Sequence, residues 1–228
     1  MSAESWILPA VSIHRISVGG MDNNVYVITG LQSGEQVLID AADDADAILA
    51  LLAEGARDAA PGTAKTAQAP VQAAQAPALL VTTHSHWDHV RALGPVIAAT
   101  GAKTAAGRDD AGDIEVPTDD LLDHGDVRQF DGFELQVIGL RGHTPGSVAL
   151  LYRDSKGPAH LFTGDSLFPG GVGNTQKDPN RFARLLDDVA TRVFAVLPDD
   201  TLVHPGHGAG TTLGAERPHL DEWRARGW

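Results

Sequence analysis

Three histidines and an aspartate fall within six consecutive positions of the segment LVTTHSHWDHV, residues 80–90. His84 and His86 stand two apart just after a predicted strand, so in an extended backbone both side chains point to one side. Asp88 and His89 follow where the chain turns toward a helix, and adjacent residues at a turn can point to a second, neighbouring position. The H-x-H-x-D-H spacing therefore offers two pairs of ligands, one pair for each of two metal ions.

Each ion still needs donors from elsewhere in the chain, because zinc usually takes four ligands. His143 in GHTPGS, Asp165 in FTGDSLF and His207 in HPGHG all follow predicted strands within glycine-rich turns. Such turns let backbones approach closely and let side chains converge at one edge of a sheet. His204 is the alternative to His207, but its LVHP setting is typical of a strand end, so we favour His207.

The remaining histidines are predicted to be hydrogen-bonded structural residues; they are His14, His124, His160 and His219. Packing the clustered imidazoles and carboxylates without a metal would be costly, because each group needs a partner. The chain has no cysteine, which excludes disulfides, thiolate nucleophiles and thiolate metal sites. We therefore expect nitrogen and oxygen ligands that hold two Zn²⁺ ions, with iron or manganese as other occupants.

The composition bounds the class of protein. With 228 residues and 43% hydrophobic content, the chain can bury the core of a single domain spanning 1–228. A formal charge of −13 argues against nucleic acid as a partner and leaves a small-molecule substrate. No apolar run approaches the ~20 residues of a membrane-spanning helix, and MSAESWILPA does not resemble a secretory signal, so we expect no membrane and a cytoplasmic location. The sequence does not indicate the oligomeric state.

The order of predicted elements indicates an α/β protein with mixed sheets. Alternation of apolar and polar residues predicts strands, and wider apolar spacing predicts helices. The predicted strands are VSIHRISV, NVYVIT, QVLIDA and ALLVTT, then 127–130, 133–139, 147–152 and 160–163, and finally LVHP; the predicted helices are 43–53, 88–100 and 179–194. Residues 55–78, rich in Ala, Gln and Pro, are predicted to form a flexible low-complexity insertion within the domain.

The set THSHWDH, GHTPGS, TGDSLF and PGHG resembles the metallo-β-lactamase-fold hydrolases, and the resemblance runs from about Ile13 to His219. It implies a four-layer αβ/βα sandwich with a two-metal site at one edge of the paired sheets. By motif position, the resemblance implies one ion held by His84, His86 and His143 and another held by Asp88, His89 and His207, with Asp165 bridging the two.

Within that superfamily, TGDSLF and TTLGAERPHL resemble short glyoxalase II-like hydrolases, which cleave thioesters such as S-lactoylglutathione. Metal coordination lowers the pKa of water from ~15.7 toward ~7, so hydroxide attack on an ester or thioester carbonyl is expected. Asp88 is the candidate catalytic residue that orients this hydroxide. Two departures concern the thiol carrier: the segment after His207 is too short for the helical domain that binds glutathione in larger relatives, and Gly173-Asn174-Thr175-Gln176 replaces their Gly-Arg-Thr-Asp.

Lys177 and Arg181 are the candidates to replace that arginine; the other interpretation is that they are solvated charges at the start of a helix. Two rival functions stay open. Persulfide dioxygenases of this fold bind a single iron through positions matching His84, His143 and Asp165, although the arginine and cysteine typical of them around 171–175 are missing here. A non-catalytic, metal-stabilised binding module would instead need a closed coordination shell. A secreted β-lactamase and a nuclease fit less well.

Overall fold

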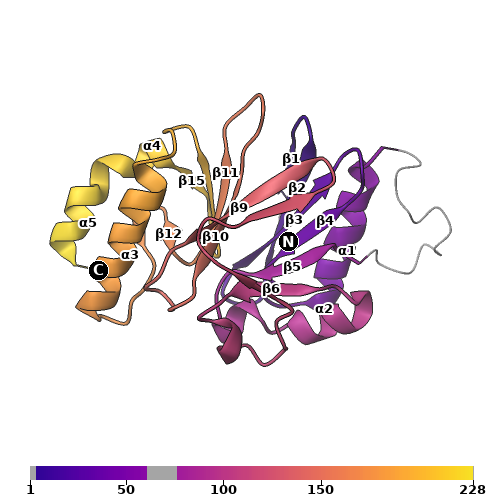
Figure 1. Cartoon of the computed structure of the whole chain (residues 1–228), viewed down its shortest axis with the longest axis horizontal. Coiled ribbons are helices and arrows are strands. Elements are labelled where there is room, and N and C mark those ends of the chain that lie inside the picture. The colour runs from indigo at the N-terminus through magenta and orange to yellow at the C-terminus, as the bar shows by residue number, and fades with distance from the viewer. Residues whose placement is uncertain (1–3, 61–75, 228) are drawn as a thin grey trace.

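The structure is a computed structural model that describes residues 4–60 and 76–227, and two sheets form its centre (Figure 1). The first sheet has the order β1-β2-β3-β4-β5-β6-β7. Neighbouring strands are antiparallel from β1 to β4 and parallel from β4 to β7. Its strands are β1 Glu4–Ile7, β2 Val11–Val18, β3 Asn23–Gly30, β4 Gln36–Ile39, β5 Leu79–Thr82, β6 Thr104–Gly107 and β7 Asp120–Leu122.

The second sheet has the order β15-β14-β11-β10-β9-β8 and is also mixed, because only β11 and β14 pair in parallel. Its strands are β8 Val127–Phe130, β9 Phe133–Gly139, β10 Val148–Tyr152, β11 His160–Gly164, β14 Leu202–Pro205 and β15 Thr211–Thr212; β12 Leu167–Phe168 and β13 Gly171–Val172 form a small hairpin. The carboxyl ends of β5, β11 and β14, which all belong to parallel pairs, lead into candidate ligands.

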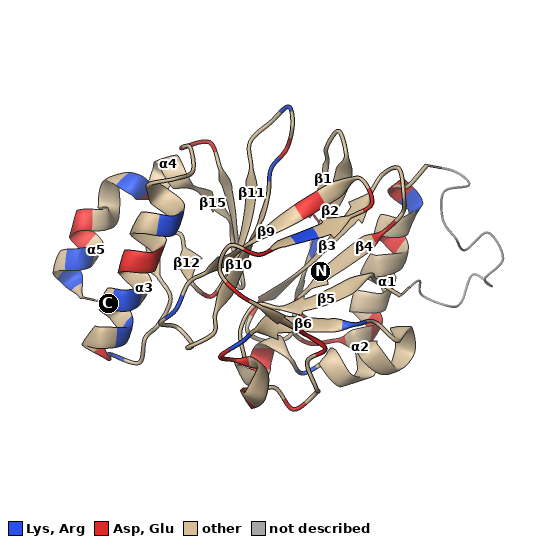
Figure 2. Cartoon of the chain, in the orientation of Figure 1, with Lys and Arg blue, Asp and Glu red and all other residues tan. Residues whose placement is uncertain are grey.

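Helices cover the outer face of each sheet (Figure 1). The first sheet carries α1 Ala45–Gly55 and α2 Leu93–Thr100, and the second carries α3 Pro179–Val189 with the short α4 Leu213–Glu216 and α5 Leu220–Arg226. Figure 2 shows that charged residues concentrate on helices and loops, whereas the strands are mostly uncharged. The layers run helices, sheet, sheet, helices, which confirms the predicted four-layer αβ/βα sandwich.

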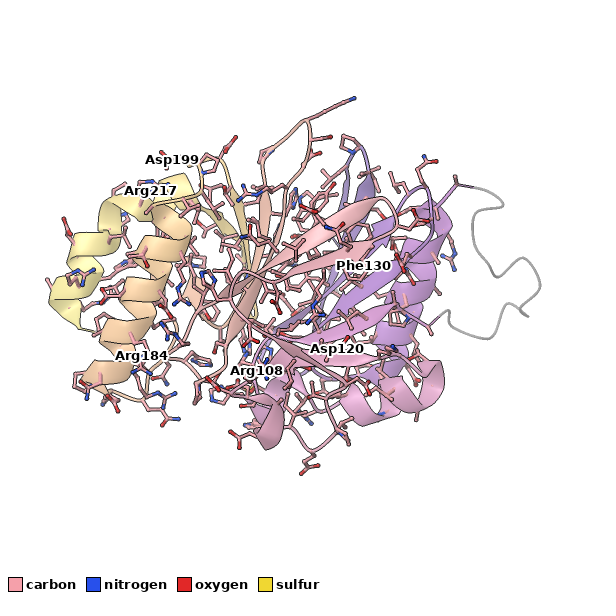
Figure 3. All side chains as sticks on the ribbon, viewed as in Figure 1. Arg108, Asp120, Phe130, Arg184, Asp199 and Arg217 are labelled. Carbon is pink, nitrogen blue, oxygen red and sulfur yellow. The ribbon has the colours of Figure 1, made fainter. Side chains whose placement is uncertain are left out.

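Alternation along each strand explains why the layers stack this way. In β3, Tyr26 and Ile28 face the core between the sheets, whereas Val25 and Val27 face α1. In the second sheet, Leu150 points into the same central core and Leu151 points toward α3. A strand side-chain period of two thus supplies apolar residues to both faces of both sheets, and each face must be covered. Figure 3 shows side chains filling the space between the two sheets.

The C-terminal helices are tied to the loop before β14. Arg217, in the 3-10 helix Arg217–His219, donates to Asp199 Oδ1 at 2.5 Å, and the two side chains lie together in Figure 3. Its guanidinium also donates to the carbonyls of Phe194 and Leu197. Within the described ranges 4–60 and 76–227, no helix combines the length and the apolar content needed to cross a membrane.

Most predicted elements are present, and one helix start was wrong. The strands at 127–130, 133–139 and LVHP have the predicted bounds, and the helix at 179–194 is an α-helix that continues as a π-helical turn from Ala190. The helix predicted at 88–100 begins only at Leu93, because Trp87–His89 forms a 3-10 turn that the ligand loop requires. Of the predicted insertion, residues 56–58 form a 3-10 helix, and 61–75 lie outside the described residues.

Candidate metal centre

Four chain segments meet at the edge of the two sheets, and each follows the carboxyl end of a strand. His84, His86, Asp88 and His89 follow β5, and His143 lies between β9 and β10. Asp165 follows β11, and His207 follows β14. The ligand atoms form three groups, each within 4.8 Å: His84, His86 and His143; His84, His89 and Asp165; and Asp88, His89 and His207. These residues include every predicted ligand and form clusters consistent with a dinuclear metal site.

Asp40, the residue after β4, orients two of the histidines. Its carboxylate accepts the Nδ1 hydrogen of His89 at 2.9 Å and the hydroxyl hydrogen of Thr83 at 2.8 Å. Because the Thr83 hydroxyl gives its single hydrogen to Asp40, it accepts from His84 Nδ1, which lies 3.1 Å away. The Nδ1 atoms of His84 and His89 are therefore protonated, and their Nε2 lone pairs remain for an ion.

Backbone carbonyls orient two more histidines in the same way. His143 Nδ1 donates to the Asn174 carbonyl at 2.8 Å, and His207 Nδ1 donates to the Met21 carbonyl at 2.8 Å. A carbonyl oxygen only accepts, so both rings also present Nε2 without a hydrogen. Four imidazoles held by four separate partners thus expose the same nitrogen to one space.

Most Nε2 atoms of these rings have no hydrogen-bond donor facing them. His89 Nε2 and His207 Nε2 face each other at 3.2 Å with no hydrogen between them in these tautomers. His84 Nε2, His143 Nε2 and Asp165 Oδ1 are buried and have no hydrogen-bond partner among the described residues. Orphaned buried polar atoms are rare and need an explanation, and a cation between them supplies one. The donor set of imidazole nitrogen and carboxylate oxygen suits Zn²⁺, iron or manganese.

Asp165 lies at the centre of this space. Its carboxylate oxygens are 3.4 Å from His89 Nε2, 3.4 Å from His207 Nε2, 3.5 Å from His143 Nε2 and 4.0 Å from His84 Nε2. These neighbours belong to both predicted ligand sets. Asp165 therefore lies where a carboxylate that bridges two ions would be needed. Gly206 allows the approach, because a Cβ there would lie only 2.2 Å from Asp165 Oδ1.

The pKa values show that the centre favours positive charge beside its carboxylates. Burial alone would raise the pKa of Asp165, but in the metal-free centre protonated His207 and His89 outweigh burial and hold that pKa far below its usual range. Burial likewise opposes protonation of His89, yet Asp40 and Asp165 together raise its pKa to about 10. The hydrogen bond to Asp165 raises the pKa of His207. A bound cation would replace the protons that these carboxylates attract.

Desolvation dominates on the other side of the centre. Burial lowers the pKa of His84 well below its ordinary value and also lowers the pKa of His143. Both rings are therefore neutral at neutral pH, the form in which a histidine binds metal. His86, Asp165 and His207 are only partly buried, so the centre is open to solvent on their side.

A second buried carboxylate, Asp110, joins two of the ligand loops. It accepts the backbone hydrogen of Ser85 at 2.8 Å, the Thr144 hydroxyl at 2.6 Å and the backbone hydrogen of Gly146 at 2.5 Å. Ser85 lies between two candidate ligands and Thr144 follows a third. The sequence does not reveal the roles of Asp40 and Asp110, because these depend on contacts about 25 to 49 residues away in the chain. Asp40 lies within the predicted strand QVLIDA, and no predicted strand leads directly into Asp110.

The alternative ligand His204 lies elsewhere. It is buried and its Nε2 is 2.9 Å from His160 Nδ1, with the two rings stacked at an interplanar angle of 10°. Of the other histidines, His14 contacts Asp58, His124 Nδ1 accepts from Gly139 and His219 is paired with Glu222 on the surface. None of these residues belongs to the groups of ligand atoms.

The two candidate substitutes for the missing arginine differ in position. Arg181 donates from Nε to the Gly142 carbonyl at 2.8 Å and from Nη2 to the His143 carbonyl, so its guanidinium holds the His143 loop. Lys177 is exposed and lines a cavity of about 720 Å³ with residues 172–175 and Gly227. This cavity lies beside the centre, since a Cβ on Gly173 would lie 3.2 Å from His143 Nδ1.

Comparison with known proteins places this geometry in a family. The model of the metallo-beta-lactamase superfamily matches residues 18–207, from the end of β2 to the last candidate ligand. The chain belongs to this superfamily. A hydroxyacylglutathione hydrolase of Fuscovulum blasticum is 30% identical over 192 residues, which are 82% of this chain and 62% of that protein. The chain covers only 42%, 62% and 47% of the first three hydroxyacylglutathione hydrolases it matches.

Solved structures agree with this family. The B3 metallo-beta-lactamase BLEG-1 matches with a TM-score of 0.74 at 24% identity, covering 92% of this chain and 99% of that one, which shows a shared fold. TTHA1623, crystallised in a di-iron-bound form, matches with a TM-score of 0.65 at 30% identity, covering 89% of this chain and 96% of that one. The superfamily member described here is thus a metal-binding α/β protein whose relatives include hydrolases.

Proposed function

We propose that this chain is a two-metal hydrolase that cleaves a small thioester or ester. The observation that carries the proposal is the convergence of four Nε2 lone pairs on the Asp165 carboxylate, with His89 and His207 nitrogens facing each other at 3.2 Å. The similarity to hydroxyacylglutathione hydrolases supports a thioester as the substrate class, and the di-iron form of TTHA1623 supports a pair of ions.

When bound, two divalent ions would supply hydroxide at neutral pH and polarise the carbonyl under attack. His84, His86 and His143 would hold one ion, and Asp88, His89 and His207 would hold the other; Asp165 would contact both. Asp88 and Asp165 would offset part of the charge of two divalent ions, and the positive charge that remained would stabilise negative charge developing on the substrate carbonyl oxygen. Asp88 would also orient the attacking water. The partly exposed side at His86 and His207 gives the substrate its access.

The cavity beside His143 supports a small substrate. Its volume of about 720 Å³ lies within the usual range for small-molecule pockets. Lys177 would place one positive charge at its rim, which favours a substrate with a carboxylate on its thiol or acyl part. Arg181 is already used by two backbone carbonyls, so Lys177 is our candidate for this contact.

The test begins with elemental analysis of protein purified without added metal. Two ions per chain are expected, followed by hydrolysis of S-lactoylglutathione or a thioester of another cellular thiol by the zinc protein. The rival is tested in parallel by supplying persulfide and oxygen to iron-loaded protein, since His84, His143 and Asp165 offer a two-histidine, one-carboxylate set. Oxygen consumption by the iron form, with no thioester cleavage by the zinc form, would contradict the hydrolase proposal and support the dioxygenase. Full coordination with no turnover of either substrate would favour the binding module.

A further inference from the structure

The start of β3 holds the loop that carries His207. The Asn24 side chain donates to the carbonyls of Pro205 and Gly208, each at 2.9 Å, and the Tyr26 hydroxyl donates to the Pro205 carbonyl at 2.7 Å. The backbone joins in, since Asn24 N donates to the Gly206 carbonyl at 2.7 Å. One end of the first sheet is thereby tied to a ligand loop of the second sheet.

Asn23 differs from its neighbours, because its side chain contacts the candidate ligands themselves. Its Nδ2 donates to Asp88 Oδ2 at 2.9 Å and to the Asp88 carbonyl at 3.1 Å, and it lies 3.5 Å from His207 Nε2. The backbone of Asn23 also forms an isolated antiparallel bridge with His207. Asp88 presents only acceptors here, so the NH₂ end of the amide must face it. Asn23 is 3% exposed and has no freedom to turn away.

The contact concerns the metal-facing oxygen of Asp88. Asp88 Oδ2 is 3.2 Å from His207 Nε2 and 3.6 Å from His89 Nε2, so it is the oxygen that shares a ligand space with both rings. A short carboxylate side chain can rotate away from such a space when no ion is bound. A donor that spans its side-chain oxygen and its own carbonyl prevents this rotation. Holding ligands in the bound geometry before binding removes an ordering cost and raises affinity.

We propose that Asn23 is a positioning residue that joins Asp88 to His207 and sets the affinity of the ion held by Asp88, His89 and His207. In the ligand set His84, His86 and His143, Thr83 holds His84 and the Asn174 carbonyl holds His143, so its ion should not depend on Asn23. This inference rests on the two-ion centre of the proposed function. It does not depend on which substrate is cleaved, because metal binding can be measured without turnover.

The test compares wild type with Asn23→Ala and Asn23→Ser, the second of which keeps a hydroxyl donor and the backbone contacts. Metal-free proteins are titrated with Co²⁺, the visible absorption of each bound ion is followed, and affinities come from competition with a chelator. In both variants one of the two ions should bind about 10–100-fold more weakly, the usual effect of losing a partner that orients a ligand, while the other ion is unchanged. Asn23→Ser should lose less than Asn23→Ala.

Gln36→Ala is the matched control. Gln36 is equally buried at 1% exposure, and its amide also makes two donor contacts, to Thr29 Oγ1 at 3.0 Å and to the Leu52 carbonyl at 2.9 Å. Its loss should lower the melting temperature of the metal-free protein and leave both cobalt affinities as in wild type. This separates a general loss of stability from a specific loss of ligand position.

The outcomes separate the two proposals. Equal affinities for both ions in wild type and in both Asn23 variants would overturn the role of Asn23 and leave the two-ion centre standing. A parallel weakening of both ions, matched by Gln36→Ala, would overturn it as well, because it would mark a purely structural residue. Wild type that takes up a single Co²⁺ would overturn the two-ion centre and this inference together.

Discussion

The carboxylate of Asp40 accepts the Nδ1 hydrogen of His89 at 2.9 Å, across 49 positions of the chain. The same carboxylate accepts the backbone hydrogen and the hydroxyl hydrogen of Thr83. Asp40 has a left-handed backbone with φ of 58°, which turns its side chain from the end of β4 toward the ligand loop after β5. A single buried anion thereby fixes the tautomer of His89 directly and that of His84 through Thr83.

Replacing Asp40 by Asn should weaken both ions. Asparagine tolerates a left-handed φ, so the backbone is kept, but a neutral amide cannot accept the same three hydrogens as a carboxylate. Metal affinity should fall about 10–100-fold, as measured by chelator competition on purified protein. Asp44→Asn is the control, since Asp44 has a similar φ of 52° and caps α1 away from the centre. An unchanged affinity in Asp40→Asn would show that the histidines need no anionic partner.

Gly206→Ala should disrupt the centre from within. The added Cβ would lie 2.2 Å from Asp165 Oδ1 and 2.8 Å from Cε1 of the fully buried His89, so at least one of these ligands must shift. Overpacking of this kind costs about 1–3 kcal/mol of stability and should also displace the bridging carboxylate. We expect fewer than two ions per chain by elemental analysis. Gly112→Ala, where nothing lies within 4 Å of the new Cβ, should keep both ions, and equal metal content in the two variants would contradict the prediction.

The sequence predicted the fold wherever local pattern and long-range packing agree. VSIHRISV alternates with period two over a full strand, and β2 spans Val11–Val18 as predicted. β6, with the sequence TAAG, and the three-residue β7, with the sequence DLL, were missed, because segments this short show no alternating pattern and become strands only by pairing with a neighbour. The start of α2 was missed for the opposite reason, since the ligand geometry at Trp87–His89 overrides helix propensity.

The candidate ligands were recognisable because histidine and aspartate at close spacing are unusual outside metal sites. The residues that hold these ligands in place were not recognisable from the sequence. Asn23, Asp40 and Asp110 are ordinary polar residues in the sequence, and only the fold shows that each is buried against a ligand loop. The chemistry of a site can thus be predicted from residue types, whereas its rigidity depends on contacts between distant segments.

Arg181→Lys should loosen the His143 loop. The planar guanidinium donates to two consecutive carbonyls, those of Gly142 and His143, and a lysine ammonium cannot reproduce this fork. The ion near His143 should bind about 10-fold more weakly in chelator competition, at the lower end of the effect of lost ligand supports. Arg184→Lys, an exposed position on the same helix that is labelled in Figure 3, is the control. Identical metal affinities in both variants would show that Arg181 does not position the His143 loop.

The buried pair His160 and His204 should make stability depend on pH below neutrality. Burial lowers the pKa of His160 to about 4 and that of His204 to about 3, whereas both return to about 6.5 in the unfolded chain. Between pH 6.5 and 4 the unfolded chain therefore binds more protons, so the free energy of unfolding falls as pH falls, by up to about 1.4 kcal/mol per pH unit for each histidine. Above pH 6.5 the pair does not change how the free energy of unfolding depends on pH.

The double variant His160→Phe/His204→Phe keeps the ring stack without a titrating group. Urea unfolding of the metal-free protein from pH 4.5 to 7.5 should show a weaker pH dependence in this variant than in wild type or in the control His219→Gln. A slope equal to that of wild type would show that the pair does not take up protons on unfolding.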